Sequence, residues 1–186
     1  MTKASKQIGK IPLKYLILMI LTSLVIGFDQ LTKSMVLAQF GLGATLPVLD
    51  HFFNLTYVQN RGAAFGFLAQ ANPSFRVPFF MIVPFIALVS IGLVFRKLPH
   101  DDRRHSSALS LVVGGAVGNL IDRVTLGFVV DFLDFHWNWV YHFPAFNVAD
   151  SAICLGVAML MLDMFIADKK QALQTEGVKF DASRAL

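Results

Sequence analysis

The stretch VPFFMIVPFIALVSIGLVF, residues 77–95, decides the fold of this chain because it carries no charged side chain. A helix needs about 20 predominantly apolar residues to cross roughly 30 Å of bilayer hydrocarbon. A soluble domain would instead repeat its apolar residues at helical or strand period, so that one face of each element meets water. The uninterrupted block therefore predicts a helix that spans a membrane.

Three further apolar blocks are close to the same length, so the chain is predicted to be an all-α membrane protein with four transmembrane helices. The helices would form a single domain, residues 1–168. The polar residues 169–186 would be a disordered tail. The three further blocks are residues 11–28, 106–121 and 148–167.

Polar residues inside these blocks can be accommodated at the membrane surface. Lys14, near the start of the first block, is expected to extend its ammonium group to the interface. Asp150 and Asp163 in the last block would lie at opposite interfaces.

The first block also resembles a cleavable signal sequence. Residues 27–30, GFDQ, are a poor small-residue cleavage site, however, so we predict a retained helix.

Basic residues indicate how the helices are oriented. They are frequent before the first block, between the second and third, and after the fourth, whereas the connections 29–76 and 122–147 carry few. Short basic loops stay in the cytoplasm. We therefore expect both termini in the cytoplasm and the two sparse connections outside. The clustered residues are Lys3, Lys6, Lys10 and Lys14; Arg96, Lys97, Arg103 and Arg104; and Lys169, Lys170, Lys179 and Arg184.

The two outward connections predict a small extracytoplasmic β-sheet. Residues 53–58, FNLTYV, alternate and are rich in aromatic and β-branched side chains. Arg61 and Gly62 would turn the chain, so that residues 63–67 could return beside this strand. Residues 128–133, FVVDFL, are a second strand candidate. We expect the sheet to rest on the outer membrane surface.

Other parts of the outward connections suit the interface itself. Residues 31–40 are amphipathic and would form an interfacial segment, and the glycines and proline of residues 41–47 would end it. An aromatic band suited to the headgroup level follows the second strand candidate. Its members are Trp137, Trp139, Tyr141 and Phe143.

Ionisable groups at a membrane boundary are costly, so each outward acid needs a reason. For Asp29, Asp50 and Asp134 the simplest interpretation is a solvated interface residue or a helix cap. Asp122 lies on the same predicted helix face as two glycines, and a structural role is preferred for it. Arg123, next to Asp122, would form a local charge pair that keeps the acid ionised.

The glycine spacing before Asp122 predicts a close helix contact. Gly114, Gly118 and Asp122 recur every four residues and so lie on one helix face. The G-x-x-x-G pattern lets the backbone of another helix approach closely. Asn119 is expected roughly on the same face.

Asp131 and Asp150 are the better candidates for chemistry. On a strand Asp131 would share a face with Val129 and Leu133, where poor solvation raises the pKa of a carboxyl group. Asp150 lies in the first turn of the last helix, one turn after Asn147, where an acid is favourable without any catalytic role. If the two carboxyl groups meet, they share a proton, and the pair can activate water and protonate a carbonyl. The residues alone leave both interpretations open.

Other chemistries have weaker support. The five histidines lack the spacing of metal ligands, so no metal site is expected. Cys154 lies in an apolar block, an environment in which a thiol is unreactive. The net charge of +4 comes without basic residues interleaved with aromatic ones on one surface, which argues against nucleic-acid binding.

Five stretches distributed along the chain form motifs. They are FDQLTK (28–33), VQNRGAAFG (58–66), GGAVGNLIDR (114–123), GFVVDF (127–132) and FPAFNVADS (143–151). In this order they resemble the lipoprotein signal peptidase family, also called signal peptidase II. The resemblance covers essentially the whole chain apart from its two tails. Phe128 stands where many family members have histidine or tyrosine.

The resemblance implies a membrane aspartic endopeptidase that needs no cofactor. Its substrates would be prolipoproteins that carry a diacylglyceryl cysteine, cleaved on the amino side of that cysteine. Asp131 and Asp150 take the positions of the catalytic dyad, and Asp29 and Asp122 those of supporting acids. Residues matching those that position the dyad and the substrate are Asn60, Arg61, Asn119, Arg123 and Asn147.

The resemblance also implies a setting and partners. The protein would lie in the bacterial cytoplasmic (inner) membrane among membrane lipids, with its active site on the outer side. A cyclic peptide of the globomycin type would inhibit it, and a single chain is expected to suffice.

Two rival classes of function stay open on the residues. A proton-coupled carrier could use Asp131 and Asp150 as a relay. A carrier, however, places such acids near the middle of the bilayer in broken, repeated helices, and no internal repeat is evident. A non-enzymatic assembly factor would keep its activity when the acids are replaced. We expect the peptidase.

Overall fold

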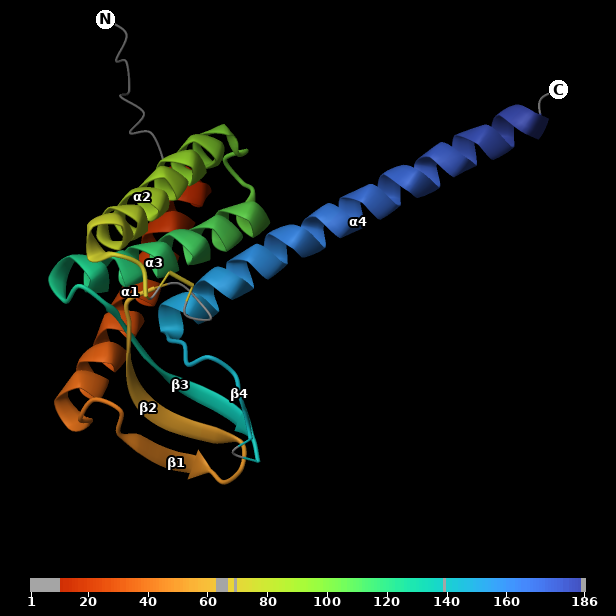
Figure 1. Ribbon diagram of the computed structural model, residues 1–186. Helices are drawn as coiled ribbons and strands as arrows, with labels where there is room; N and C mark the ends of the chain where they lie inside the picture. The colour runs from red at the N-terminus through yellow and green to blue at the C-terminus, as the bar shows by residue number, and fades with distance from the viewer. Residues whose placement is uncertain (1–10, 63–66, 69, 139, 185–186) are drawn as a thin grey trace, which may run out of the picture.

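The computed structural model describes residues 11–184 except 63–66, 69 and 139. Within this part of the chain, four helices stand beside a four-stranded antiparallel sheet (Figure 1). The helices are α1 (Leu13–Gln39), α2 (Pro73–Lys97), α3 (Arg103–Thr125) and α4 (Val148–Arg184). The strands are β1 (Thr45–Leu49), β2 (Phe53–Asn60), β3 (Val129–Trp137) and β4 (Tyr141–His142), in the spatial order β1-β2-β3-β4.

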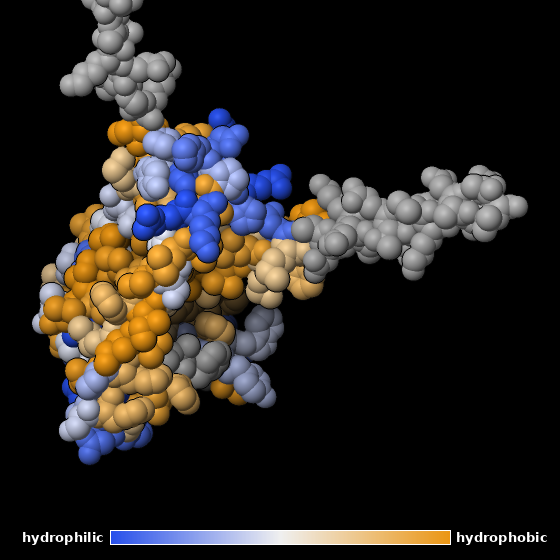
Figure 2. All heavy atoms as spheres, turned by 90° about the horizontal axis from the view of Figure 1, so that it is seen from above, coloured by the Kyte–Doolittle hydropathy of each residue, from blue (hydrophilic) through white to orange (hydrophobic). Residues whose placement is uncertain are grey.

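All four helices contain a segment long and apolar enough to cross a membrane. Much of the face seen in Figure 2 is hydrophobic, and the most hydrophilic side chains gather in its upper part and at its lower left edge. Such a large exposed apolar surface is stable only against lipid or another apolar partner. The predicted fold class, four membrane helices with a small sheet, is confirmed.

Helix α3 is the centre of the bundle and packs against the other three helices. In its apolar segment 44% of the residues are buried, against 6% in α1 and α2. A helix that faces protein rather than lipid can carry more polar residues, which explains why its block is only marginally apolar in sequence. The predicted close approach is confirmed at Gly114, where an added Cβ would lie 2.8 Å from the Cβ of Val25 in α1.

Two elements differ from the sequence expectations. The amphipathic residues 31–40 are not a separate interfacial segment, because α1 continues through them to Gln39 and buries Asp29, Lys33 and Val36 on one side. Strand β1 occupies residues predicted only to break the chain. It is an edge strand, exposed at every position, where Pro47 is tolerated because no ladder hydrogen bond has to be donated on the open side.

The polar residues at the far end of the bundle also tie helices together. Lys14, which was expected to extend its ammonium group to the interface, is 1% exposed, and its Nζ donates to the carbonyl oxygens of Arg96 (3.1 Å) and Leu98 (2.8 Å). It thereby pairs carbonyls that the end of α2 leaves unsatisfied. Asp163 lies 3.6 Å from Arg104 of α3. The tail predicted to be disordered instead continues α4 to Arg184.

The sheet lies at one end of the bundle (Figure 1). The chain enters it twice, from α1 and from α3, and leaves it into α2 after β2 and into α4 after β4. Strands β2 and β3 are its centre, and a bulge on β2 between Leu55 and Val58 shifts the register against β3. A small core beneath them joins the sheet to the last turns of α1. Its buried members are Val36, Tyr57, Val130 and Phe132.

Candidate active site

Asp131 and Asp150 come together where the sheet meets the helices. Asp131 lies on β3 and is 2% exposed, and Asp150 lies in the first turn of α4 and is partly buried. The order of the elements along the chain explains how the two acids meet. β3 runs from the end of α3, and the short connection after β4 leads directly into α4.

Asn147 links the two acids. Its Nδ2 donates to Asp131 Oδ1 at 2.7 Å. Its backbone N–H donates to Asp150 Oδ2 at 3.2 Å, and the backbone N–H of Asp150 donates to Asn147 Oδ1 at 2.9 Å. This reciprocal pair is a capping box in which asparagine and aspartate replace the usual serine and glutamate. The cap that starts α4 therefore also fixes the distance between the two carboxyl groups.

Each acid receives a second amide. Asn60 Nδ2, at the end of β2, donates to Asp131 Oδ2 at 2.9 Å. Asn119 Nδ2, on α3, donates to Asp150 Oδ1 at 2.7 Å. The two carboxyl groups thus share one asparagine and hold one more each, which leaves them little freedom to rotate.

Burial and, to a smaller extent, the nearby charge of Asp150 raise the pKa of Asp131 to about 7. The amides of Asn60 and Asn147 and the ammonium of Lys33 act in the opposite direction, because they favour the charged carboxylate. At neutral pH the carboxyl group of Asp131 therefore exists in both protonation states. A pair of this kind can give a proton to one group and take a proton from another.

Asp29 and Asp122 hold the backbone just before each member of the pair. Asp29 Oδ1 accepts the N–H of Ala149 at 2.9 Å, one residue before Asp150. Asp122 Oδ2 accepts the N–H of Val130 at 3.0 Å, one residue before Asp131. Both acids are nearly fully buried. These contacts give the two acids a structural function. The family resemblance had implied a supporting role for both acids, whereas the residues alone had suggested one only for Asp122.

Lys33 is a central residue that sequence analysis did not select. Its Nζ lies 2.8 Å from Asp29 Oδ2 and 3.0 Å from Asp122 Oδ2, and it donates to Asn119 Oδ1 at 3.0 Å. Gln30 adds a bond from its Nε2 to Asp122 Oδ1 at 2.8 Å. The signal in the sequence was the motif FDQLTK, in which residues 29, 30 and 33 fall within about one helical turn.

The charge of Arg123 interacts with Asp122, as predicted, but more strongly with Asp150 and Asp131, and the hydrogen bonds of its guanidinium go elsewhere. Successive residues of a helix point in different directions, so adjacent side chains do not face each other. The Arg123 guanidinium donates instead to the backbone carbonyls of Asn119 and Gly62, both at 3.2 Å, and lies 5.2 Å from the ring centre of Phe80. It thereby ties α3 to the chain after β2 and to α2.

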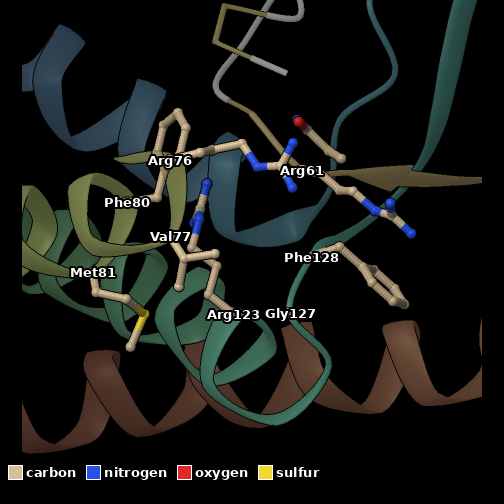
Figure 3. A pocket seen from close by; sticks show the side chains of 9 residues that line it. Arg61, Arg76, Val77, Phe80, Met81, Arg123, Gly127 and Phe128 are labelled. Carbon is tan, nitrogen blue, oxygen red and sulfur yellow. The ribbon is translucent and has the colours of Figure 1, made fainter. Parts of the chain in front are cut away.

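A cavity opens next to Asn60, on the side of α2. Arg76 and Arg123 extend along it near the ring of Phe80, and the Arg61 side chain extends in another direction (Figure 3). Arg61 is exposed and Asn60, which bonds to Asp131, also lines the cavity. The remaining lining is largely apolar: Val77, Phe80, Met81, Gly127 and Phe128. Of the predicted return strand at residues 63–67, residues 63–66 lie outside the described residues, and Phe67 lies in a turn.

The arrangement as a whole can support hydrolysis by two carboxyl groups. One neutral and one charged acid, held by amides next to an arginine-lined cavity, can polarise a carbonyl and activate a water. Asn60, Asn119, Arg123 and Asn147 lie around the pair, and Arg61 lies at the cavity. Asp50 is exposed at a turn of the sheet and takes no part.

Comparisons with known proteins point the same way. A profile of the family described as signal peptidase (SPase) II matches residues 21–166. The lipoprotein signal peptidase of Syntrophotalea carbinolica is 52% identical over 149 residues, which are 80% of this chain and 91% of the relative. That of Geobacter sulfurreducens is 51% identical over 153 residues, 82% and 92% of the two chains. A solved structure of a bacterial membrane enzyme is 34% identical with a TM-score of 0.74, covering 82% of this chain and 90% of its own.

Proposed function

Because the chain belongs to the signal peptidase II family, we propose that it removes signal peptides from diacylglyceryl-modified prolipoproteins by aspartic catalysis. Cleavage would fall on the amino side of the lipidated cysteine. The observation that carries the proposal is the link through Asn147, which bonds to Asp131 Oδ1 at 2.7 Å and exchanges two bonds with Asp150. Two carboxyl groups held in this way have the composition that aspartic proteolysis needs.

The chemistry needs the pair to hold one proton. The charged carboxyl group takes a proton from water while the water oxygen bonds to the peptide carbonyl carbon. The neutral carboxyl group donates its proton to the carbonyl oxygen, which gives a tetrahedral intermediate. As the intermediate collapses, the bond between carbon and nitrogen breaks and the leaving amine takes up a proton from the pair. One hydroxyl group of the intermediate returns its proton to the pair as the new carboxyl group forms, so the pair again holds one proton. The pKa of Asp131, about 7, supports a shared proton at neutral pH.

The surrounding polar residues would position the acids and the substrate. Asn60 and Asn119 each donate to one acid. Arg123 joins α3 to the chain after Asn60 through the carbonyl of Gly62, so it holds the cavity wall in place. Arg61 and Arg76 would offer donors to carbonyls of the bound peptide. An inhibitor of the globomycin type would fill the same cavity.

The lipid of the substrate would stay in the bilayer. The cavity next to Asn60 is also lined by Val77, Phe80 and Met81 of α2, a helix whose surface is otherwise mostly exposed and apolar. A peptide bond could therefore reach the acids while the acyl chains of the adjacent cysteine remain among lipids. We propose a single chain in the bacterial inner membrane, with the sheet outside and both termini in the cytoplasm.

Replacing either acid tests the proposal. Purified Asp131→Asn and Asp150→Asn enzymes are incubated with a lipidated prolipoprotein, and cleavage is followed by gel shift. Each variant is expected to insert into the membrane and to lose cleavage, with a rate reduction of at least about 1,000-fold. Asp50→Asn, an exposed acid at a turn of the sheet, is the matched control and is expected to cleave normally.

Two outcomes would contradict the proposal. Full processing of the prolipoprotein by Asp131→Asn or Asp150→Asn would show that the replaced acid is not catalytic. Complete loss of activity in the unaltered enzyme on adding a chelator would indicate a metalloprotease instead. A variant that fails to reach the membrane fraction is separated from an inactive one by its detergent-solubilised yield relative to Asp50→Asn.

A further inference from the structure

A second group of chemically active side chains lies on the sheet, away from the acid pair. It consists of Asp134, His136 and His142, and one possible ligand atom from each lies within 4.8 Å of the others. Asp134 and His136 are buried, whereas His142 is exposed. The expectation that the histidines form no metal site used only their spacing along the chain, which does not report this convergence.

Strand register brings the three residues together. Asp134 and His136 are two residues apart on β3, so their side chains point to the same face of the sheet. His142 of β4 pairs directly with His136, and Asn54 of β2 pairs directly with Asp134. Asp131 is three residues before Asp134 and therefore points to the opposite face. The group is separate from the proposed catalytic pair.

The carboxyl group of Asp134 is already oriented. Asn54 Nδ2 donates to Asp134 Oδ2 at 3.0 Å, which leaves Oδ1 facing His142 Nδ1 at 3.1 Å. Asn54 Nδ2 is also 3.3 Å from His136 Nδ1. Metal ligands are commonly fixed by such outer hydrogen bonds, and a fixed carboxylate loses little freedom when it binds an ion.

A buried amide oxygen near the group has no partner. Asn54 is 0% exposed, and its Oδ1 makes no hydrogen bond to any of the described residues. Buried polar atoms are nearly always satisfied by protein or by water, so this one indicates a missing donor. A water bound to a metal ion beside Asp134 would place a donor next to this amide.

We propose that Asp134, His136 and His142 bind a divalent transition-metal ion, with Zn²⁺ as the best match. Two imidazoles and one carboxylate are borderline ligands typical of Zn²⁺, and the exposed side of His142 leaves room for water as the fourth ligand. The histidines would bind in their neutral form, and the ion would replace the hydrogen bond between His142 and Asp134.

The ion would stabilise the sheet rather than take part in hydrolysis. β4 is only two residues long and is held to β3 by its pairing at His136 and Trp137. Residues 143–147 follow it and lead to Asn147 and α4. A metal ion that joins β4 to β3 would therefore hold the start of the connection that carries Asn147.

Zinc binding is measured on the full-length enzyme in detergent, with any histidine tag removed, by competition against a chromophoric chelator. The unaltered enzyme is expected to bind one equivalent. His142→Gln and Asp134→Asn are each expected to weaken binding by at least about tenfold. His105→Gln is the matched control, because His105 also pairs with an aspartate, Asp102 at 2.9 Å, but no third ligand joins this pair among the described residues.

Thermal unfolding provides a second readout. Saturating Zn²⁺ is expected to raise the unfolding midpoint of the unaltered enzyme and of His105→Gln, because the ion binds only the folded sheet. The midpoint of His142→Gln should not rise, and since His142 is exposed this variant is expected to fold. Cleavage of prolipoprotein should persist in the chelator, which separates this proposal from the proposed function.

The proposal fails if the unaltered enzyme shows no saturable binding of Zn²⁺. It also fails if His142→Gln and Asp134→Asn bind as tightly as the unaltered enzyme, or if His105→Gln loses binding as they do. Weaker binding in both cluster variants together with normal binding in His105→Gln supports it.

Discussion

At the scale of single residues, the carboxyl group of Asp131 sets the pH range in which the enzyme should work. Burial and the neighbouring Asp150 bring its pKa to about 7. The shared proton is retained below that pKa and lost above it, so kcat/KM is expected to fall as the pH rises through about 7, by about tenfold per further pH unit. This alkaline limb of the pH profile is measured from initial rates with a lipidated prolipoprotein between about pH 5 and about pH 9. A rate that is flat or rising across neutral pH would contradict it.

Asn60 should shift this limb, because its amide favours the charged form of Asp131 through a 2.9 Å bond. Asn60→Ala removes that support, so the pKa of Asp131 rises and the alkaline limb is expected to move up by about one pH unit. Gln59→Ala is the matched control, since Gln59 bonds to the hydroxyl group of Tyr57 and not to Asp131. A shift to lower pH, or an equal shift in both variants, would show that Asn60 acts by another route.

Sequence predicted single residues well where their neighbours in sequence determine the environment. Asp131 was expected to be poorly solvated from the apolar alternation around it, and it is 2% exposed. Lys33 was overlooked, because a lone lysine in a sparsely charged connection resembles a surface residue. Lys33 lies between Asp29 and Asp122 because α1 continues past the predicted span and packs against α3. Neither feature can be predicted from the residues next to Lys33 in the sequence.

At the scale of elements, the contact between α1 and α3 depends on Lys33. The lysine is buried between two acids, Asp29 and Asp122. Removing its ammonium group would leave the buried carboxylates without their positive partner. Lys33→Met is therefore expected to lower the free energy of unfolding by about 3–5 kcal/mol. Chemical denaturation in detergent measures the loss. Lys97→Met, an exposed lysine at the end of α2, should change stability by less than about 0.5 kcal/mol. Equal stability of the two variants would mean that the buried pairs contribute nothing.

Gly118 controls how closely three elements approach the site. A Cβ at this position would lie 2.7 Å from Asp29 Oδ2 and 3.4 Å from the Cβ of Ala149. Gly118→Ala should therefore push Asp29 away from the backbone of Ala149, destabilise the protein by about 1–3 kcal/mol and slow cleavage. Gly27→Ala is the control, since nothing lies within 4 Å of its Cβ. Both readouts come from unfolding and cleavage assays of the two purified variants. If Gly118→Ala cleaves as fast as Gly27→Ala, this close contact does not position the acid.

The elements themselves were predictable to different degrees for a physical reason. Apolar blocks must be long to cross a bilayer, so the helices are visible in the sequence. β1 is exposed at every residue, so its sequence lacks the alternation of polar and apolar side chains that would predict a strand. It exists because β2 offers a free edge, and Thr45 pairs with Thr56 along it.

At the scale of the whole molecule, the sheet lies at one end of the bundle, and the start of α1 and the end of α4 lie away from it (Figure 1). α1 runs toward the sheet, and α4 begins beside the sheet and runs away from it (Figure 1). The connection between α2 and α3 lies at the end near Lys14, as the backbone bond from Lys14 to the His100 carbonyl at 3.2 Å shows. Four spans require this connection and both termini to share one side of the membrane. The clustered basic residues favour the cytoplasm for that side.

Cysteine labelling tests this orientation in intact bacterial cells. In a Cys154→Ala background, Asp50→Cys places a thiol at an exposed turn of the sheet, and Asp101→Cys places one at the exposed connection between α2 and α3. A membrane-impermeant maleimide that passes the outer membrane should label Asp50→Cys in intact cells and Asp101→Cys only after the inner membrane is opened. The two variants control for each other, because each must be labelled once both compartments are accessible. The reverse order would place the acid pair in the cytoplasm, where an exported signal peptide does not emerge, and would overturn the proposed function together with the orientation.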